Sequence, residues 1–597
     1  MSAKKILCLS LALLLVLSLA ACSPSSSTPP TDNPASNNPS SNPSNNPSGD
    51  PAPNDEEPTL DNTPHALYDP LGKYEPAIEV TTVHTYNDGP FWFPEGEELG
   101  NDVYTKRYEE QLGIKYTYKW TAPGSQSAEK KATMFVSGDL PDFMTVNRNE
   151  FAQLYAAGQL EDLTVPLAEY ASDYTRQFLT GEYQMLRDYA TMDGRVYGIT
   201  NGLTYQDGGE MIWIRKDWLD KLSLEVPKTV ADLENIMEQF KKHNPSGLSE
   251  DESFPISIGG ADQNQWSYTM QVAFYNMFGS YPSGWHQISD GTLNHGLFGA
   301  EFRDNTRTAL EKANEYFNKG YIESDFTTKS GNMSYQDIYN GKNGILFGEL
   351  WSAYWPLIMH RDTDPEADWI AVPIVNNGSQ QGMVARDAAQ CVGIIVARKG
   401  VEHPEAIVKM TNLFHDLNNN PDTMEFEKFN TAMDGNQLLH VYPMYIYNPS
   451  FNYDAYLEIS AAQASGDFDG LCDGYKMLYE QGINFELGLE GGDWAAARSY
   501  LAGNTALAVC ESYVKNKDIM FREYTGDPTE HMLDNEPTVK KMFDVMAANV
   551  ITGNSSISAF DDFIKSWDEI YGNTATQEVN DWFVANGSNS FQSRLGK

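Results

Sequence analysis

Apolar positions recur along the chain with two different periods, which predicts helices that alternate with strands. After a capping Thr229, side chains spaced three or four residues apart from Val230 to Phe240 predict an amphipathic helix. Further segments repeat this helical spacing, at 407–417 and 560–570. Runs of β-branched or aliphatic residues predict strands, at 77–83, 344–347 and 394–397. This alternation indicates an α/β fold.

The beginning of the chain has the pattern of an export signal. Lys4 and Lys5 precede an unbroken run of apolar and small residues that ends at Ala21 and is too short for a comfortable membrane span. The run ends in Leu-Ala-Ala-Cys, which resembles the lipobox of bacterial lipoproteins, where the cysteine becomes the acylated N-terminus. We therefore expect a signal peptide over 1–21 and a lipid anchor at Cys22. The alternative is an ordinary cleaved signal in which Cys22 is incidental.

The next segment, 22–64, consists almost wholly of Ser, Pro, Asn, Thr, Asp and Glu. Such a segment buries too little apolar surface to offset its ordering entropy, so we expect a disordered tether. Residues 65–597 follow it, and they are too many for one hydrophobic core. We expect them to form a single binding domain with two lobes.

Charge excludes two classes of partner. The chain has 41 Lys and Arg residues against 83 Asp and Glu residues, and its formal net charge is −42. Nucleic acids and anionic membrane surfaces require clustered basic side chains, so neither is an expected partner of the folded domain. The acidic excess is typical of an exported protein that must stay soluble.

The residues offer no support for a metal, a cofactor or a catalytic centre. Beyond Cys8 and Cys22 there are only Cys391, Cys472 and Cys510, and no CxxC pair indicates a zinc ribbon. The chain contains no GxSxG, HExxH or phosphate-binding glycine loop. The histidines His286 and His295 are isolated in sequence, and we expect both at the surface.

One corner motif points to a known family. From Met134 to Asp142 the chain reads as a helix that Gly138 closes in a left-handed conformation and Pro141 stops, before a strand that starts at Phe143. This motif resembles the SGDLPD corner of extracellular solute-binding proteins. Other segments follow in that family's order, at 157–164, 193–198, 213–222, 226–229, 320–326 and 403–406. The chain thus resembles family 1 of these proteins, and within it the lipoproteins that bind oligosaccharides or alginate.

This resemblance implies a fold, a function and a location. The fold would be the α/β, two-lobed periplasmic-binding-protein type (type II), with discontinuous lobes, hinge strands and a ligand cleft between the lobes. The function would be capture of an oligosaccharide and its delivery to the permease subunits and ATPase of an ABC importer, by a monomer without cofactor or catalysis. The location would be the extracytoplasmic face of the cell membrane. Two alternatives stay open: a secreted glycan-acting enzyme such as a glycosidase, and a passive carbohydrate-binding lipoprotein of the cell surface.

A carbohydrate cleft needs flat aromatic faces for the sugar rings and fixed polar groups for the hydroxyls. From their places in the family's pattern we expect ligand contacts at Trp92, Tyr205, Asp207, Glu210, Trp266, Trp285 and Trp351. Each of these tryptophans could instead pack inside a lobe. Trp213 and Trp218 lie in a strand-to-helix motif, and we expect them in a core.

Alginate-binding relatives carry a calcium loop after the helix that corresponds here to 230–242. The matching stretch is 244–252, in which Leu248 stands where the pattern needs an oxygen and Asn244 replaces a carboxylate. Calcium takes about six to eight oxygen ligands. We therefore favour a polar surface turn and predict no metal, with a retained calcium loop as the alternative.

Overall fold

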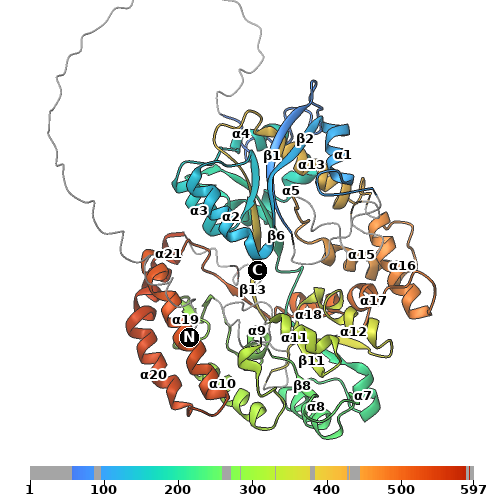
Figure 1. Ribbon diagram of the computed structural model, residues 1–597, viewed down its shortest axis with the longest axis vertical. Coiled ribbons are helices and arrows are strands. Elements are labelled where there is room, and N and C mark those ends of the chain that lie inside the picture. Colours follow the sequence, from blue (N-terminus) through green and yellow to red (C-terminus); the bar gives the residue numbers. More distant parts are fainter. Residues whose placement is uncertain are drawn as a thin grey trace, which may run out of the picture. The chain divides into compact units, whose positions relative to one another are not determined.

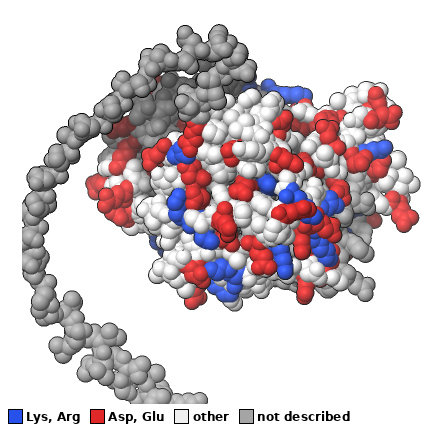
Figure 2. All heavy atoms as spheres, turned by 90° about the horizontal axis from the view of Figure 1, so that it is seen from above, with Lys and Arg blue, Asp and Glu red and all other residues white. Residues whose placement is uncertain are grey.

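The computed structural model describes residues 57–86, 96–258, 271–282, 284–329, 331–376, 384–425, 429, 444–586 and 591. Glu57–Lys597 form one compact unit of mixed helices and sheets (Figure 1). None of the helices described is both long enough and apolar enough to cross a membrane. Acidic side chains are spread over the face seen in Figure 2, with basic side chains interspersed among them.

The first lobe is built from two segments, 57–204 and 389–448. Its strands are β1 (Ile78–Tyr86), β2 (Ile114–Pro123), β3 (Phe143–Val146), β4 (Thr191–Met192), β5 (Arg195–Val196), β6 (Gly198–Thr204) and β14 (Ala389–Ala397). β1 pairs with β2 in parallel, and β14 lies between β3 and β6 and runs antiparallel to both. Its helices are α1 (Val103–Arg107), α2 (Gly124–Ser137), α3 (Arg148–Ala156), α4 (Thr164–Tyr170), α5 (Asp173–Gln177), α6 (Gln184–Asp188) and α13 (Glu405–Asn418).

The second lobe is built from the described residues between 205 and 388 and between 449 and 591. One sheet has the order β12 (Trp369–Val372), β7 (Met211–Arg215), β11 (Asn343–Gly348), β8 (Phe254–Ile256), and the other has the order β10 (Leu293–His295), β9 (Trp285–Gln287), β15 (Ile519–Arg522), β13 (Val384–Asp387). The helices before residue 364 are α7 (Lys216–Leu222), α8 (Val230–His243), α9 (Gln271–Asn276), α10 (Arg303–Asn318), α11 (Gly331–Tyr339) and α12 (Leu357–Thr363). The later helices are α15 (Phe451–Ser465), α16 (Asp473–Leu487), α17 (Trp494–Tyr500), α18 (Ala506–Asn516), α19 (Glu530–Ile551), α20 (Ser558–Trp567) and α21 (Asn573–Asn586).

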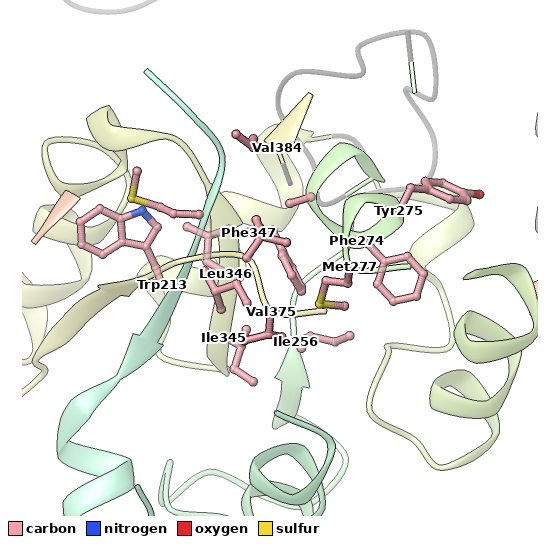
Figure 3. Close-up of a cluster of buried hydrophobic side chains, with 14 of the residues drawn as sticks. Trp213, Ile256, Phe274, Tyr275, Met277, Ile345, Leu346, Phe347, Val375 and Val384 are labelled. Carbon is pink, nitrogen blue, oxygen red and sulfur yellow. The ribbon is translucent and has the colours of Figure 1, made fainter. Parts of the chain in front are cut away.

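Each lobe has its own hydrophobic core. In the second lobe, Trp213 of β7, Phe347 of β11, Ile256 of β8 and Phe274 of α9 belong to one cluster of buried side chains (Figure 3). Large apolar side chains buried in this way each contribute roughly 1.5–3 kcal/mol to folding. Trp213 and Trp218 are fully enclosed in this core, which confirms the sequence prediction for both. Two separate clusters, which meet on the β3–β14–β6 sheet, form the interior of the first lobe.

Local sequence signals account for where several elements begin and end. The Thr229 side chain accepts a hydrogen bond from the N–H of Asp232, and the Asp232 carboxylate accepts one from the N–H of Thr229. Helix α8 therefore begins with a capping box. Gly138 takes φ 70° and closes α2 ahead of β3. Asp193 and Gly194, at φ 51° and 77°, make the turn between β4 and β5. The helix after Thr229 and the corner at Gly138 were predicted correctly because each depends on residues close together in sequence.

The compact unit begins at Glu57, so residues 57–64, which the sequence places in the tether, pack on the first lobe. Leu60 is buried there. Basic side chains hold the backbone or the acidic groups of the segment: Arg176 Nη1 donates to the carbonyl of Thr63 (2.7 Å), Arg187 pairs with Asp61 (2.9 Å) and Arg195 pairs with Glu57 (2.7 Å). Polar composition alone did not reveal these contacts, because their partners lie more than a hundred residues away.

Candidate functional site

The two lobes are connected where three chain crossings lie side by side. β6 and β14 form one antiparallel pair, and its pairing extends past the strand ends, where the Tyr205 N–H donates to the carbonyl of Ala388 (3.2 Å). On the other side of β6, the Thr204 N–H donates to the carbonyl of Pro449 (2.9 Å). The three connections that the described residues make between the lobes are thus joined by backbone hydrogen bonds at one level, which is the arrangement of a hinge.

A cavity of about 380 Å³ lies beside this hinge. It is lined by Arg148, Phe151, Ala152, Met185, Asp188, Tyr189, Thr191, Met192, Asp387, Ala388, Ala389, Arg522, Thr525, Gly526, Asp527, Trp582, Asn586 and Phe591. The first of these come from α3, α6 and β4 of the first lobe, and the last come from β15, the loop after it and α21 of the second lobe. Both lobes and the hinge strand therefore contribute to one concave site.

Four of the charged groups that line the cavity form two pairs. Arg148 Nη2 donates to the carbonyl of Thr525 (3.2 Å) and lies 3.4 Å from Asp527 Oδ1, so this arginine of the first lobe reaches the second. The Arg148 guanidinium also lies over the Tyr189 ring, 4.7 Å from its centroid. In the second lobe, Arg522 Nη1 donates to Asp387 Oδ2 (2.7 Å). These pairs fix the directions of donors and acceptors before any ligand arrives.

Aromatic rings stand next to these polar groups. The Tyr189 hydroxyl donates to the carbonyl of Ala389 (2.9 Å), which fixes its ring against the hinge strand. Trp582 of α21 is half-buried and packs edge-on against Tyr524, with ring centroids 4.8 Å apart. Flat apolar faces beside fixed hydrogen-bonding groups are the combination that a pyranose or furanose ligand requires.

Two predicted ligand contacts lie at the hinge itself. Tyr205 is half-buried, with its ring edge-on to Phe521 at 5.2 Å. Asp207 is 2% exposed, and its carboxylate accepts from the N–H of Tyr453 (2.9 Å) and from Asn452 Nδ2 (3.0 Å). Both oxygens of Asp207 serve the beginning of α15, so in this structure the side chain stabilises a helix and is closed to a ligand. Burial raises the pKa of Asp207 to about 7.

Glu210 and Trp351 both lie near the Glu349 carboxylate, and Glu210 is also within electrostatic range of Arg522. Trp351 Nε1 donates to Glu349 Oε2 (3.1 Å), and the Trp351 ring stacks on Trp355 with centroids 6.0 Å apart. Glu210 Oε2 is buried without a hydrogen-bond partner among the described residues. Burial and the nearby Glu349 carboxylate raise the pKa of Glu210 to about 8, while Arg522 acts in the opposite direction. Neither Glu210 nor Trp351 lines the cavity, and their predicted ligand contacts stay predictions.

Of the remaining predicted tryptophans, Trp285 is the one that lies among the described residues, and it does not line the cavity. Trp285 lies in β9, is 6% exposed and packs edge-on against His295 at 5.3 Å, so it is part of the second lobe's core in this structure. Trp92 and Trp266 fall outside the residues that the structure describes.

The stretch 244–252 forms a turn closed by its own side chains. Asn244 Nδ2 donates to the carbonyl of Leu248 (2.7 Å), and Ser246 Oγ donates to Asn244 Oδ1 (2.6 Å). The Leu248 N–H in turn donates to Ser246 Oγ (3.1 Å). Oxygens that a cation would need are thus engaged within the turn, which favours the polar surface turn. Across the described residues, no cluster of three His, Cys, Asp or Glu side chains is arranged to hold a metal.

The expectation that two histidines lie at the surface was wrong. His286 is fully buried, its Nδ1–H donates to the carbonyl of Phe521 (2.9 Å), and burial lowers its pKa to about 3. His295 is half-buried and stacks on Phe298, with centroids 4.9 Å apart. Both lie on the short strands β9 and β10, whose packing partners come from distant segments and left no local signal.

The sequence did not single out the lining residues of the cavity. Arg148 directly follows a recognisable strand, and Trp582 lies in an aromatic segment near the C-terminus, but nothing local distinguishes either from a surface residue. Position was the one available signal for Arg148 and Thr525, which follow β3 and β15, two strands of different sheets. Tertiary packing then brings them together with Tyr189 and Asp387.

Comparison with known proteins gives matches in sequence and in fold. The "Polygalacturonan/rhamnogalacturonan-binding protein YtcQ" of Bacillus subtilis (strain 168) is 26% identical over 251 residues, which are 41% of this chain and 46% of that protein. The "Fructooligosaccharide ABC transporter substrate-binding protein FusA" of Streptococcus pneumoniae is 26% identical over 294 residues, 47% of this chain and 51% of that protein. This chain therefore spans about half the length of these relatives.

A solved structure of the alginate-binding protein AlgQ2 without calcium ion superposes with a TM-score of 0.55 at 16% identity, over 86% of this chain and 99% of that one. This likeness shows that the fold is the two-lobed fold of periplasmic solute-binding proteins, as predicted. The family model described as "Bacterial extracellular solute-binding protein" matches residues 97–410. Since that segment is more than half of the chain, the protein belongs to the bacterial extracellular solute-binding proteins.

Proposed function

We propose that this protein captures an oligosaccharide in the cavity beside the hinge and delivers it to an ABC importer. The observation that carries the proposal is the origin of the lining: Arg148 and Tyr189 come from the first lobe, while Arg522 and Trp582 come from the second. A ligand in this cavity contacts both lobes at once. Such contacts favour the closed arrangement over the open one, which is the signal that a permease can read.

The proposed ligand class rests on the lining chemistry and on the relatives. Paired arginines and carboxylates next to Tyr189 and Trp582 suit a ligand that has many hydroxyls and apolar ring faces. The names of the relatives FusA and YtcQ refer to a fructooligosaccharide and to pectic polysaccharides. Both names support a carbohydrate, and they differ in whether that carbohydrate is charged.

The proposal includes an anchor and partners. Cys22 would carry the lipid at the extracytoplasmic face of the cell membrane, and the polar segment after it would hold a monomeric binding domain within reach of two permease subunits and their ATPase. The protein itself would act without catalysis, metal or cofactor, since solute-binding proteins deliver their ligand unchanged.

Binding without conversion is directly testable. The purified protein is incubated with a mixture of oligosaccharides, and its melting temperature is recorded while the sugars are analysed by chromatography. A bound sugar at about 100 times its Kd adds roughly 2.7 kcal/mol to the free energy of unfolding and is recovered intact. Steady product formation would instead support a glycosidase, and the absence of any shift with any glycan would contradict the proposal.

A further inference from the structure

Arg386 of β13 is a buried arginine for which the described residues supply no partner. It is 9% exposed, and its Nε is buried without a hydrogen-bond acceptor. Within the described part of the chain its guanidinium also forms no ion pair. A buried charge without compensation destabilises the folded state, so an arginine in such a position normally has an acceptor. Arg386 therefore requires a polar partner from elsewhere, which is either water or a ligand.

The Arg386 guanidinium lies against the hinge loop, which we define as residues 205–210. A Cβ atom at Gly208 would overlap Arg386 Nη2, so the guanidinium occupies the space that a side chain at position 208 would take. The residue after Arg386 in β13 is Asp387, which lines the cavity. Arg386 thus lies where the hinge loop meets the strand that borders the cavity.

Two further buried atoms in this region have no hydrogen-bond partner among the described residues, namely Arg522 Nε and Glu210 Oε2. Glu210 is within electrostatic range of both Arg522 and Arg386, yet in the described chain it forms an ion pair with neither. The Tyr513 hydroxyl fixes the hinge loop at this point, because it donates to the Glu210 carbonyl (3.0 Å). Arg522 also lines the cavity, so these unpartnered atoms adjoin the site already described.

The three unpartnered groups match the bonding capacity of a hydroxyl group. The Nε–H groups of Arg386 and Arg522 can only donate, whereas an oxygen of Glu210 accepts. A hydroxyl can accept two hydrogen bonds and donate one, and bonds of this kind to charged groups are stronger than those between neutral groups. Water has the same capacity as a sugar hydroxyl, so an experiment has to distinguish the two sources.

We infer that Arg386, Arg522 and Glu210 form a subsite that binds hydroxyl groups of one sugar unit of the oligosaccharide. The inference rests on the proposed function and names residues that recognise its ligand. The subsite extends the ligand site from the cavity to the hinge loop. An unpaired buried arginine destabilises the empty protein, and such a residue is typical of a binding site, where function is kept in spite of lower stability.

Arg386→Met separates a ligand contact from a structural role. The Met side chain is unbranched and uncharged, so the melting temperature should equal that of the wild type or exceed it. The probe is the glycan that the wild type binds most tightly on a printed array of neutral and acidic oligosaccharides. Calorimetric titration should show an affinity for this glycan that is about tenfold to a hundredfold lower in the variant. The control is Arg498→Met, which removes an arginine of the same lobe that pairs with Asp368 (2.9 Å) outside the lining, and which should keep wild-type affinity.

Gly208→Ala is a second variant, and it keeps every functional group of the subsite. Its added Cβ overlaps Arg386 Nη2 and displaces the guanidinium, so the affinity should fall as it does in Arg386→Met. Deoxy derivatives of the probe, each without one hydroxyl, identify the contact. One derivative should bind the wild type about tenfold more weakly than the parent glycan, and it should bind Arg386→Met as tightly as the parent glycan does.

Three outcomes would overturn the inference. Unchanged affinity in both Arg386→Met and Gly208→Ala would show that water satisfies the unpartnered atoms, and the proposed function would stand. A lower melting temperature of Arg386→Met, with the same loss of affinity for every deoxy derivative as for the parent glycan, would assign Arg386 a structural role. A loss confined to glycans that carry a carboxylate would identify a carboxylate subsite in place of a hydroxyl subsite. If the wild type binds no glycan of the array, the proposed function and the inference fail together.

Discussion

The Asp207 carboxylate accepts a hydrogen bond from the backbone N–H of Tyr453 at 2.9 Å, so the first chain crossing of the hinge caps a helix that follows the third crossing. Ser450, the residue at the N-cap of α15, makes no capping bond with its own side chain. A residue 246 positions earlier in the chain supplies the acceptor instead. Two crossings are thus fixed to each other by one buried acid.

Asp207→Ala should lower the free energy of unfolding by about 1–3 kcal/mol. The variant leaves the N–H of Tyr453 and the amide of Asn452 without their acceptor in a buried environment. Urea denaturation followed by circular dichroism measures the change. Asp473→Ala is the control, because Asp473 begins α16 at the surface, and it should change stability by no more than about 0.5 kcal/mol. Equal effects of the two variants would contradict the capping role.

Because of Glu210, the free energy of unfolding should depend on pH between about pH 4 and pH 8. Burial and the Glu349 carboxylate raise its folded pKa to about 8, above an unfolded value of about 4.3. The folded state then binds the proton more tightly, so the free energy of unfolding falls as pH rises from about 4 to about 8. Glu210→Gln removes this contribution, and its profile should be flatter than that of the wild type by up to about 1.4 kcal/mol per pH unit.

Urea titrations of both proteins at several values between pH 5 and pH 8 measure this difference. Glu79→Gln serves as the control, because the Glu79 side chain is 75% exposed on β1, and it should leave the profile unchanged. Parallel profiles for the wild type and Glu210→Gln would show that Glu210 has no raised pKa.

Trp582→Ala should weaken oligosaccharide binding and leave the fold intact. The ring lines the cavity and is half-buried, so truncation removes contact area from the ligand, with an expected loss of about 1–3 kcal/mol or roughly tenfold to two-hundredfold in affinity. Calorimetric titration with an oligosaccharide that raises the melting temperature of the wild type measures it. Trp120→Ala, which removes a half-buried ring that contacts Lys130 outside the lining, should keep wild-type affinity.

A Trp351 variant tests whether the ligand site extends beyond the cavity into the second lobe. If its ring is a sugar platform, Trp351→Ala weakens binding by about 1–3 kcal/mol with a melting temperature close to that of the wild type. If its stacking on Trp355 and its hydrogen bond to Glu349 are structural instead, the variant keeps its affinity and its free energy of unfolding falls. The upper limit of that fall is about 3–5 kcal/mol, the cost of truncating a fully buried aromatic side chain. The first outcome would extend the ligand site beyond the cavity, and the second would exclude Trp351 from it.

Cys22→Ala should abolish membrane attachment through lipid. The thiol at this position is the acylation site that the preceding Leu19-Ala20-Ala21 predicts, and the variant should be released or remain unprocessed. Metabolic labelling with a fatty acid, followed by fractionation of cells and medium, measures the change. Cys391→Ala is the control and should be labelled like the wild type. Equal labelling of the wild type and Cys22→Ala would contradict the anchor.

Several secondary-structure elements and the family could be predicted from the sequence. Most of the residues that line the site could not. The helix capped by Thr229 and the corner at Gly138 rest on interactions between residues a few positions apart, and both formed as predicted. Prediction of ligand contacts relied on the order of motifs along the chain. Two of the predicted residues, Tyr205 and Asp207, lie at the hinge, but none of the predicted residues lines the cavity beside it.

The sequence by itself determined the α/β alternation, the two-lobed family and the acidic character, because periodicity, turn residues and charge are properties of neighbouring residues or of simple sums. Only tertiary structure decided that Arg148 meets Asp527 and that Arg522 meets Asp387. It also decided that Asp207 caps α15 and that His286 is buried. The physical reason is that these environments are assembled from segments hundreds of residues apart, whose proximity depends on how two cores and three hinge crossings pack rather than on any local pattern.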